Sequence, residues 1–448
     1  MESDERKRLE SEDLRLPART HSTDMPLAAS RPKVRVLACS GSLDGGGSER
    51  QLWQFVSKLD RRRFEPEVYL LSRRGVYLDQ LPRDVPVHAF DDDDPQPLGF
   101  PPGHISRLQA RHLRHVVMTR GIDVVYDRTF HLTLLTGSAC RVAPPRVSVI
   151  VSPPSRDLLG TERRWVWLKR WLLARAYRSA AATICVSGEV ADEAAAFYAL
   201  PRERLIVMPN PIDIAQVRLQ AEQSTAPGSL CTPAERRAAG ELHIAVIGRF
   251  TAEKGQGFAI EVAAEVARQT SLSNEADPAA KLSASRARSL PVVHLHLVGS
   301  GPLEPQLKEL AQRLGVAANV HFHGYLTNPY PLLQNCDVAF VPSQYEGFPN
   351  VALEALALGV PIMMTDYGPT ARYILGASGE RGELIPAGQS ATAVAALTDL
   401  WQNPQRWTSR ALAGRAWVEG AHSLEAWLHS MSGLLERVHR KERIVGVL

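Results

Sequence analysis

The sequence of 448 residues has no apolar run of the roughly 18 residues that a membrane-spanning helix needs. Its longest candidate, residues 351–364, is interrupted by Glu354. The start of the chain, with Glu2, Asp4 and Glu5, lacks the apolar core of a secretory signal. These absences predict a soluble, cytoplasmic protein that can lie only peripherally on the inner face of the cell membrane.

A strong excess of charge of one sign is also missing. Lys and Arg together number 52 against 48 Asp and Glu, which gives a net charge of +4. A dedicated nucleic-acid binder carries a concentrated basic surface, so we expect no nucleic-acid partner.

Cysteine is scarce, with five residues, and no pair has C-x-x-C spacing. Neither a structural zinc site nor a disulfide framework is indicated, and a reducing cytosol is the simplest location. The cysteines are Cys39, Cys140, Cys185, Cys231 and Cys336.

What is present is an ordinary globular composition, 44% hydrophobic and 22% charged, long enough for two or three domains. Thirteen charged side chains without periodicity predict a disordered tail over residues 1–32. Strands alternate with helices over 33–211 and again over 242–425, which predicts two α/β domains with parallel sheets. Residues 212–241 are predicted as a linker with an insertion, and residues 426–448 as a C-terminal helix and tail.

Two cations flank a short loop at the first strand-to-helix turn of the second α/β domain. Arg249 and Lys254 lie in GRFTAEKG, after the apolar strand that starts at His243. Arginine can bind a diphosphate in a bidentate manner, lysine adds a point charge, and the following helix offers its amides. The alternative is a solvated loop with two surface cations.

A second segment, SQYEGFPNVALE, places one glutamate in a loop and another inside an apolar helix. Glu346 follows the buried strand 338–341, and Glu354 lies within the helix that begins near Pro349. Burying an unpaired carboxylate is unfavourable, so Glu354 needs a partner. Sugar hydroxyls are one choice, and a neighbouring arginine in a structural pair is the other.

Glu346 and Glu354, with seven residues between them, resemble the E-x7-E element of retaining family 4 glycosyltransferases, the group 1 enzymes of GT-B type. The resemblance extends over most of residues 33 to about 425. It rests on further motifs in the expected order: GGGSERQ, Val186-Ser187, the segment 208–213, GRFTAEKG, LVGSGP and Ile385-Pro386-Ala387-Gly388.

The resemblance implies a GT-B fold, two Rossmann-like α/β domains facing across a cleft, and roles for individual residues. Arg249 and Lys254 would neutralise the donor diphosphate in place of a metal ion, Glu354 would hold the ribose hydroxyls, and Glu346 would contact the donor hexose. Backbone groups would complete the donor site; they belong to Gly46, Gly47, Gly299, Gly347, Phe348, Asn350 and Val351.

Two positions depart from the family pattern. Many members carry a histidine after the strand that corresponds to Val147–Val151, where this chain has Ser152 and Pro153. His131 is our substitute candidate on the acceptor side, with a structural histidine as the alternative. Relatives also often have an acidic residue near Thr370, where Arg372 and Tyr373 follow here.

The implied activity is transfer of a hexose or N-acetylhexosamine, with retention, from a nucleotide-sugar donor to a sugar or lipid-linked sugar. UDP-sugars are the commonest donors among relatives, and such enzymes serve cell-surface polysaccharide or glycolipid synthesis. Neither a cofactor nor a metal is expected. The alternatives are a non-catalytic nucleotide-sugar-binding protein and an NAD-dependent oxidoreductase; the latter lacks a complete G-x-G-x-x-G motif and a carboxylate after the second strand.

Three other features have competing interpretations. Asp91–Asp94 could bind a metal but is predicted as a solvated loop, and the pairs His294/His296 and His321/His323 lack nominated further ligands, so they are predicted to be structural. On helix 163–178 five arginines share a face with Trp167 and Trp171, while Leu168, Leu172, Leu173 and Ala176 turn toward a core. That face suits either an anionic membrane surface or plain solvation.

Overall fold

The computed structural model describes residues 32–93, 103–161, 165–223, 233–276, 290–442 and 444. They form two wholly parallel sheets of seven and six strands, in the orders β3-β2-β1-β4-β5-β6-β7 and β10-β9-β8-β11-β12-β13. The predicted tail 1–32 lies almost entirely outside the described residues.

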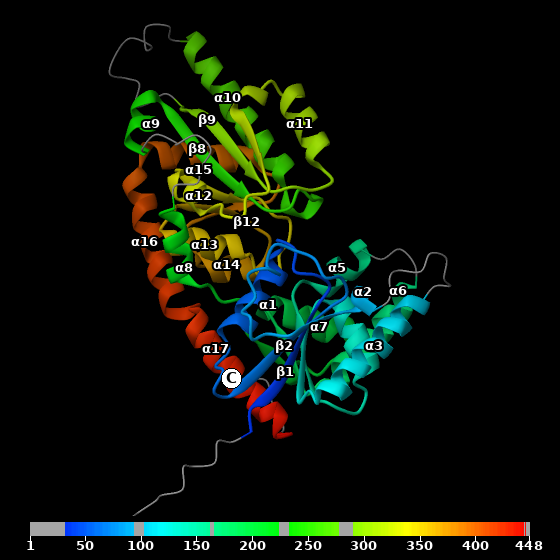
Figure 1. Ribbon diagram of the computed structural model, residues 1–448. Helices are drawn as coiled ribbons and strands as arrows, with labels where there is room; N and C mark the ends of the chain where they lie inside the picture. Colours follow the sequence, from blue (N-terminus) through cyan, green and yellow to red (C-terminus); the bar gives the residue numbers. More distant parts are fainter. Residues whose placement is uncertain are drawn as a thin grey trace, which may run out of the picture. The chain divides into compact units, whose positions relative to one another are not determined.

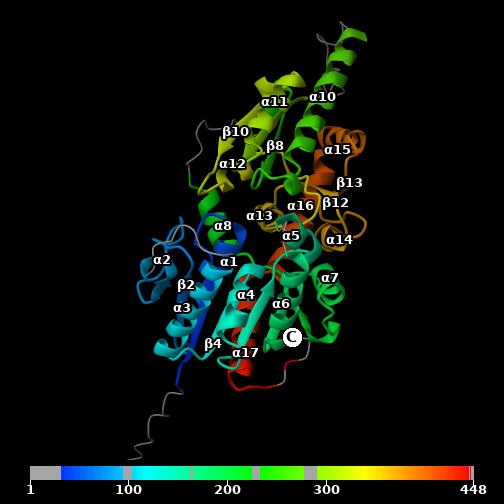
Figure 2. The same ribbon diagram turned by 90° about the vertical axis from the view of Figure 1, so that its right-hand side faces the viewer.

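The first sheet is built from short β-branched and apolar runs that are buried nearly throughout, as parallel strands covered on both faces require. Its strands are β1 (Val34–Ser40), β2 (Phe64–Leu70), β3 (Val87–Ala89), β4 (Val124–Arg128), β5 (Arg146–Ile150), β6 (Ala182–Cys185) and β7 (Leu205–Val207). The connecting helices are α1 (Gly47–Lys58), α2 (Phe90–Asp93), α3 (His104–Arg120), α4 (Phe130–Ala139), α5 (Pro154–Thr161), α6 (Val166–Ser179) and α7 (Gly188–Tyr198). Helices α3, α4 and α6 pack side by side (Figure 2).

The second sheet follows two helices, α8 (Ile214–Ala221) and α9 (Pro233–Ala239). Its strands are β8 (Glu241–Ile247), β9 (Val292–Val298), β10 (Val320–Gly324), β11 (Val338–Val341), β12 (Ile362–Asp366) and β13 (Glu383–Pro386). Its helices are α10 (Gln256–Ala276), α11 (Glu304–Arg313), α12 (Tyr330–Asn335), α13 (Asn350–Leu358), α14 (Pro369–Leu375) and α15 (Ser390–Gln402). Figure 1 shows α10 beside β8 and β9, where apolar side chains of the strands form a core with Ile260 and Val266.

The chain crosses between the two sheets twice, at neighbouring points. Ile212 forms a parallel bridge with Ser423, and its amide donates to the carbonyl of His422 at 2.9 Å. Helix α16 (Pro404–Ala421) packs on α13, whereas α17 (Leu424–His439) packs on β4 and β5 (Figure 1). There Trp427 meets Phe55 of α1 edge-on, with ring centroids 6.0 Å apart.

No helix among the described residues is long and apolar enough to cross a membrane. Four cysteines are buried as free thiols, while Cys231 lies outside the described residues.

Candidate functional site

The predicted site residues of the second domain follow the carboxyl ends of β8, β9 and β11. Lys254, at the end of a short 3-10 turn after β8, donates from Nζ to Oε1 of Glu346 at 2.6 Å. Ser343 donates its hydroxyl to the same oxygen at 2.9 Å. The structure thus brings together two side chains that are 92 positions apart in sequence, and it fixes the glutamate between a cation and a hydroxyl.

Arg249, five residues before Lys254 on the same connection after β8, is exposed, and its backbone carbonyl accepts from Gln256 at 2.8 Å. Its guanidinium interacts with two carboxylates of the first domain. Burial raises the pKa of Glu49 on α1 and of Asp157 on α5, and the Arg249 charge opposes both rises. The Arg249 charge is therefore near two carboxylates from helices of the first domain.

Two of the predicted glycines are required by close backbone approach. Gly299 has a φ of +140°, and a Cβ there would lie 2.0 Å from the carbonyl oxygen of Gly248. A Cβ on Gly347 would lie 1.9 Å from the carbonyl oxygen of Val151. The loop that contains Glu346 therefore touches the chain at the end of β5, where the family's usual histidine is replaced.

The glycine-rich loop of the first domain lies against the amino end of α13. Gly46 precedes α1, and a Cβ on Gly47, the first residue of α1, would lie 2.7 Å from Nδ2 of Asn350. Phe348 is buried, and Val351 is partly buried in the first turn of α13. The predicted backbone groups from both domains are thus neighbours.

Glu354 pairs with an arginine whose identity the sequence did not indicate. Its carboxylate accepts from Arg50 of α1, and Arg50 also donates to the hydroxyl of Tyr330 at 2.9 Å. The Glu354 side chain is 5% exposed and that of Arg50 is 22% exposed. Burial lowers the pKa of Arg50, but the Glu354 carboxylate, together with Tyr330 and Tyr77, raises it above its ordinary value. The pair is the arginine partnership named above as the structural alternative, although the arginine comes from the other domain.

A carboxylate carries about four lone-pair directions on its two oxygens. Glu354 can therefore accept ribose hydroxyls in addition to Arg50. Its assignment to the ribose stays a prediction.

Sequence reasoning also missed a network at the first crossover. Asn210 donates from Nδ2 to Oδ1 of Asn350 at 3.0 Å and to the carbonyl of Phe348 at 3.3 Å. Arg128, buried at the end of β4, donates to Oδ1 of Asn210 at 3.4 Å and to Ser48 at 3.3 Å. The only sequence indication was the position of Asn210 between two prolines in the segment 208–213.

The remaining candidates, His131 and Arg372, lie on helices α4 and α14. His131 is exposed in the first turn of α4, just after the carboxyl end of β4, and its acceptor role stays a prediction. Arg372 is paired with Asp366 at 2.8 Å, so its charge is offset locally. Across the two domains, Glu189 of α7 accepts from the hydroxyl of Thr370 at 2.8 Å.

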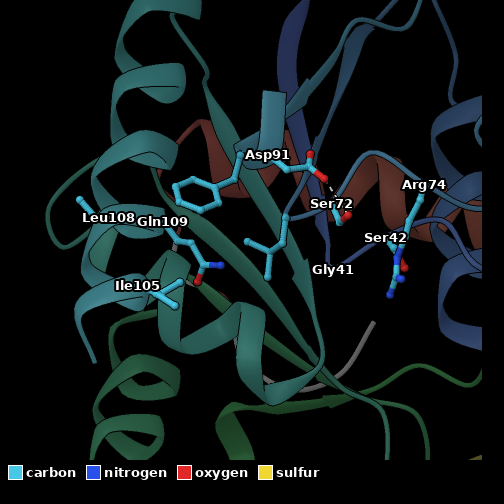
Figure 3. A pocket seen from close by; sticks show the side chains of 10 residues that line it. Gly41, Ser42, Ser72, Arg74, Asp91, Ile105, Leu108 and Gln109 are labelled. Atoms are coloured by element: carbon cyan, nitrogen blue, oxygen red, sulfur yellow. Dashed lines mark hydrogen bonds between the residues drawn. The ribbon is translucent and has the colours of Figure 1, made fainter. Parts of the chain in front are cut away.

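A pocket of about 310 Å³ opens at the carboxyl ends of β1 and β2 (Figure 3). One part is apolar, formed by Leu71, Phe90, Ile105 and Leu108; the other is polar, formed by Ser42, Ser72, Arg74, Asp91 and Gln109. Asp91 accepts from the hydroxyl of Ser72 at 2.7 Å and from the amide of Arg73 at 2.9 Å, and Asp92 pairs with Arg73. Asp91 therefore forms part of the pocket wall, and residues 91–93 lie in the short helix α2 instead of the predicted solvated loop. Asp94 lies outside the described residues.

Five histidines lie side by side across β8, β9 and β10, on the opposite face from the core packed against α10. They are His243, His294, His296, His321 and His323. Burial and the neighbouring histidines lower the pKa of His296 to about 2, and burial lowers those of His321 and His323. The rings of His296, His321 and His323 are therefore neutral at physiological pH.

Comparison with known proteins decides the family. The protein-family model described as Glycosyltransferase Family 4 matches residues 45–216. The family model described as Glycosyl transferases group 1 matches residues 233–416. The chain belongs to these glycosyltransferases. The two matches follow the two sheets, and they confirm the resemblance inferred from the E-x7-E element.

Among curated relatives, the putative glycosyltransferase EpsF of Bacillus subtilis is 24% identical over 74% of this chain and 79% of its own length. The lipopolysaccharide core biosynthesis mannosyltransferase LpsB of Rhizobium meliloti is 28% identical over 31% of this chain and 39% of its own. The matches to the first three curated relatives span 27%, 79% and 57% of those proteins.

Among solved structures, Alr3699/HepE of Anabaena in complex with UDP-glucose superimposes with a TM-score of 0.70 at 20% identity. The superposition covers 90% of this chain and 99% of that protein. This shared fold and the two parallel sheets confirm the predicted GT-B architecture.

Proposed function

We propose that this glycosyltransferase transfers a hexose or N-acetylhexosamine from a UDP-sugar to a sugar or lipid-linked sugar, with retention of anomeric configuration. The observation that carries the proposal is the set of charges around the loop 343–350. Lys254 pairs with Glu346 in the loop before α13, and Arg249 belongs to the same turn as Lys254. Two such cations suit the charge that develops on a diphosphate leaving group. Glu346 and Glu354 supply acceptors for sugar hydroxyls within the same segment.

The reaction needs no protein nucleophile. The bond between C1 of the sugar and the diphosphate oxygen breaks, and a bond between C1 and the acceptor oxygen forms on the same face. The acceptor proton passes to the departing diphosphate. The chain's own task is then to stabilise the departing charge with Arg249 and Lys254, so we expect donor binding without a metal ion.

Two features favour UDP as the nucleotide. UDP-sugars are the commonest donors of the family, and the Anabaena protein of the same fold is described in complex with UDP-glucose. The relative LpsB acts in lipopolysaccharide core biosynthesis, and we assign this chain to cell-surface polysaccharide or glycolipid synthesis on that ground.

We assign the acceptor to the pocket at β1 and β2. Its mixture of apolar and hydrogen-bonding walls suits a sugar, whose ring faces are apolar and whose edges carry hydroxyls. Gly41 and Ser42 of this pocket belong to the same glycine-rich connection as Gly46 and Gly47, and Gly47 lies against Asn350 of α13.

A lipid-linked acceptor would place the enzyme on the inner face of the cell membrane, and α6 is our candidate contact. Trp167 is 69% and Trp171 56% exposed, and Leu172, predicted to turn inward, is 40% exposed. The arginines that the structure describes on this face, Arg170, Arg175 and Arg178, are exposed as predicted. Arg170 donates to the carbonyl of Phe197 and Arg178 to that of Ala199, while Arg163 and Arg164 lie outside the described residues.

The proposal is tested by incubating the protein with UDP-glucose, UDP-N-acetylglucosamine or GDP-mannose and following the nucleotide released. Slow transfer to water serves as an acceptor-independent readout, and NMR identifies the first anomer of the free sugar. We expect release from a UDP-sugar and a first product with the donor's configuration. Inversion would refute retention, and release only from GDP-mannose would refute the UDP assignment.

A further inference from the structure

The pairing of β8 with β9 supplies the histidines of β9 with the further ligands that the sequence did not reveal. His243 of β8 lies directly opposite His294 of β9, and their rings stack with centroids 4.8 Å apart. Two residues earlier on β8, Oε2 of Glu241 lies 3.4 Å from Nε2 of His243. Two imidazoles and a carboxylate therefore converge at the amino-terminal end of the second sheet.

We propose that Glu241, His243 and His294 bind one divalent transition-metal ion of the zinc type. Their ligand atoms lie within 4.8 Å of one another. Bonds of about 2.0–2.2 Å to a tetrahedral zinc ion place ligand atoms roughly 3.3 Å apart, a separation that small side-chain rotations reach. The donor set, two imidazoles and one carboxylate, favours zinc, cobalt, nickel or copper over magnesium and calcium, which prefer oxygen ligands.

The other histidines orient the two imidazole ligands. Nδ1 of His243 lies 2.8 Å from Nε2 of His296, and Nδ1 of His294 lies 3.1 Å from Nε2 of His321. Each of the two ligand histidines thus uses its Nδ1 for a contact within the row of five histidines, and we assign its Nε2 to the metal. Metal-binding histidines commonly hold their second nitrogen in this way, which fixes the tautomer and the ring orientation.

The surroundings allow an ion to enter and be held. The side chain of Glu241 is 39% exposed whereas that of His243 is 7% exposed, so the site is open on the carboxylate side. The nearby cation Arg236 lies 3.5 Å from Asp337, whose carboxylate offsets its charge.

The site lies at the opposite end of β8 from Arg249. A strand rises about 3.3 Å per residue, so the seven residues of β8 separate the two ends by roughly 20 Å. A bound metal would tie the start of β8 to β9 and stabilise the fold; it would not act on the donor diphosphate.

The test uses the full chain without a histidine tag, first dialysed against a chelator. Zinc is titrated by calorimetry and cobalt by visible absorption, and thermal denaturation is recorded with and without zinc. We expect one equivalent of metal, a cobalt spectrum of low-symmetry coordination, and a higher melting temperature with zinc, because a ligand that binds only the folded state stabilises it.

His243→Ala, His294→Ala and Glu241→Gln should each weaken zinc binding by at least about tenfold. His115→Ala, at an exposed histidine on α3 of the first domain, is the matched control and should bind zinc like the wild type. If burial makes the histidine variants unstable, Glu241→Gln, at a partly exposed side chain, still tests the site.

Absence of stoichiometric binding would overturn the proposal. So would zinc affinity unchanged in folded Glu241→Gln, or reduced as much in His115→Ala as in the three ligand variants. In those cases the row of five histidines is a hydrogen-bonded structural feature only.

Discussion

Replacing Glu354 separates two roles for one carboxylate. In the family's pattern it binds the ribose hydroxyls, whereas in the structure it is held by Arg50 of the opposite domain. We propose to measure the affinities of wild type and Glu354→Ala for UDP and for 2′,3′-dideoxy-UDP, which lacks both ribose hydroxyls. The quantity of interest is the ratio of the two affinities in each protein.

If Glu354 binds the ribose, its hydrogen bonds contribute about 1–3 kcal/mol in the wild type. The wild type should then prefer UDP by about 5- to 150-fold, since every 1.4 kcal/mol is a factor of ten. In Glu354→Ala this preference should fall to near one, because the acceptor for the hydroxyls is gone.

The same substitution breaks the pair with Arg50, and this effect is measured separately by denaturation. Removing one partner of a buried ion pair destabilises a protein by about 3–5 kcal/mol. We expect the lower end, about 3 kcal/mol, because Arg50 is 22% exposed and keeps its bond to Tyr330. Arg50→Ala should lose similar stability yet retain the preference for UDP.

The assay is isothermal calorimetry with all proteins below their melting temperatures, and Glu425→Ala, at an exposed residue of α17, is the control. A preference for UDP that persists undiminished in Glu354→Ala would refute the ribose assignment. The carboxylate would then serve only to join α13 to α1.

Further substitutions test the rest of the site. Arg249→Ala should lower kcat by more than it weakens UDP binding, because the charge it stabilises grows as the bond breaks; equal turnover in variant and wild type would exclude it from the mechanism. Gly347→Ala places a Cβ 1.9 Å from the carbonyl oxygen of Val151, so we expect a strong loss of turnover, whereas Gly160→Ala, with open space around it, should be neutral. Similar activity in both variants would show that the two domains do not meet in this way. Trp167→Ala with Trp171→Ala should abolish sedimentation with anionic liposomes while Leu412→Ala, at an exposed residue of α16, should not; retained binding in the double variant would exclude α6 as a membrane contact.

Local patterns predicted most elements of the fold because parallel strands are short, continuous apolar runs between turns. The strand at 292–298 and the helix near 349–358 follow from such runs, closed by glycine and proline. Strand β3, with three residues, and β13, whose run Glu383–Pro386 is partly polar, have too little pattern to be recognised.

Residues that act through pairs distant in sequence were the hardest to predict. Lys254 and Glu346 were each identified from their own motifs, but nothing local indicates that they touch. The role of Arg50 could not be predicted for the same reason, because its partner Glu354 lies 304 positions away in the other domain. The histidines were recognised strand by strand, and only the register of β8 against β9 adds His243 to them.

The most direct test of the account is calorimetric binding of UDP, GDP and NAD to the wild type in the presence of a chelator, repeated with magnesium. The account predicts that UDP binds without metal, that magnesium leaves its affinity unchanged, and that GDP and NAD bind far more weakly. Binding of NAD in preference to UDP, or UDP binding that requires magnesium, would contradict it.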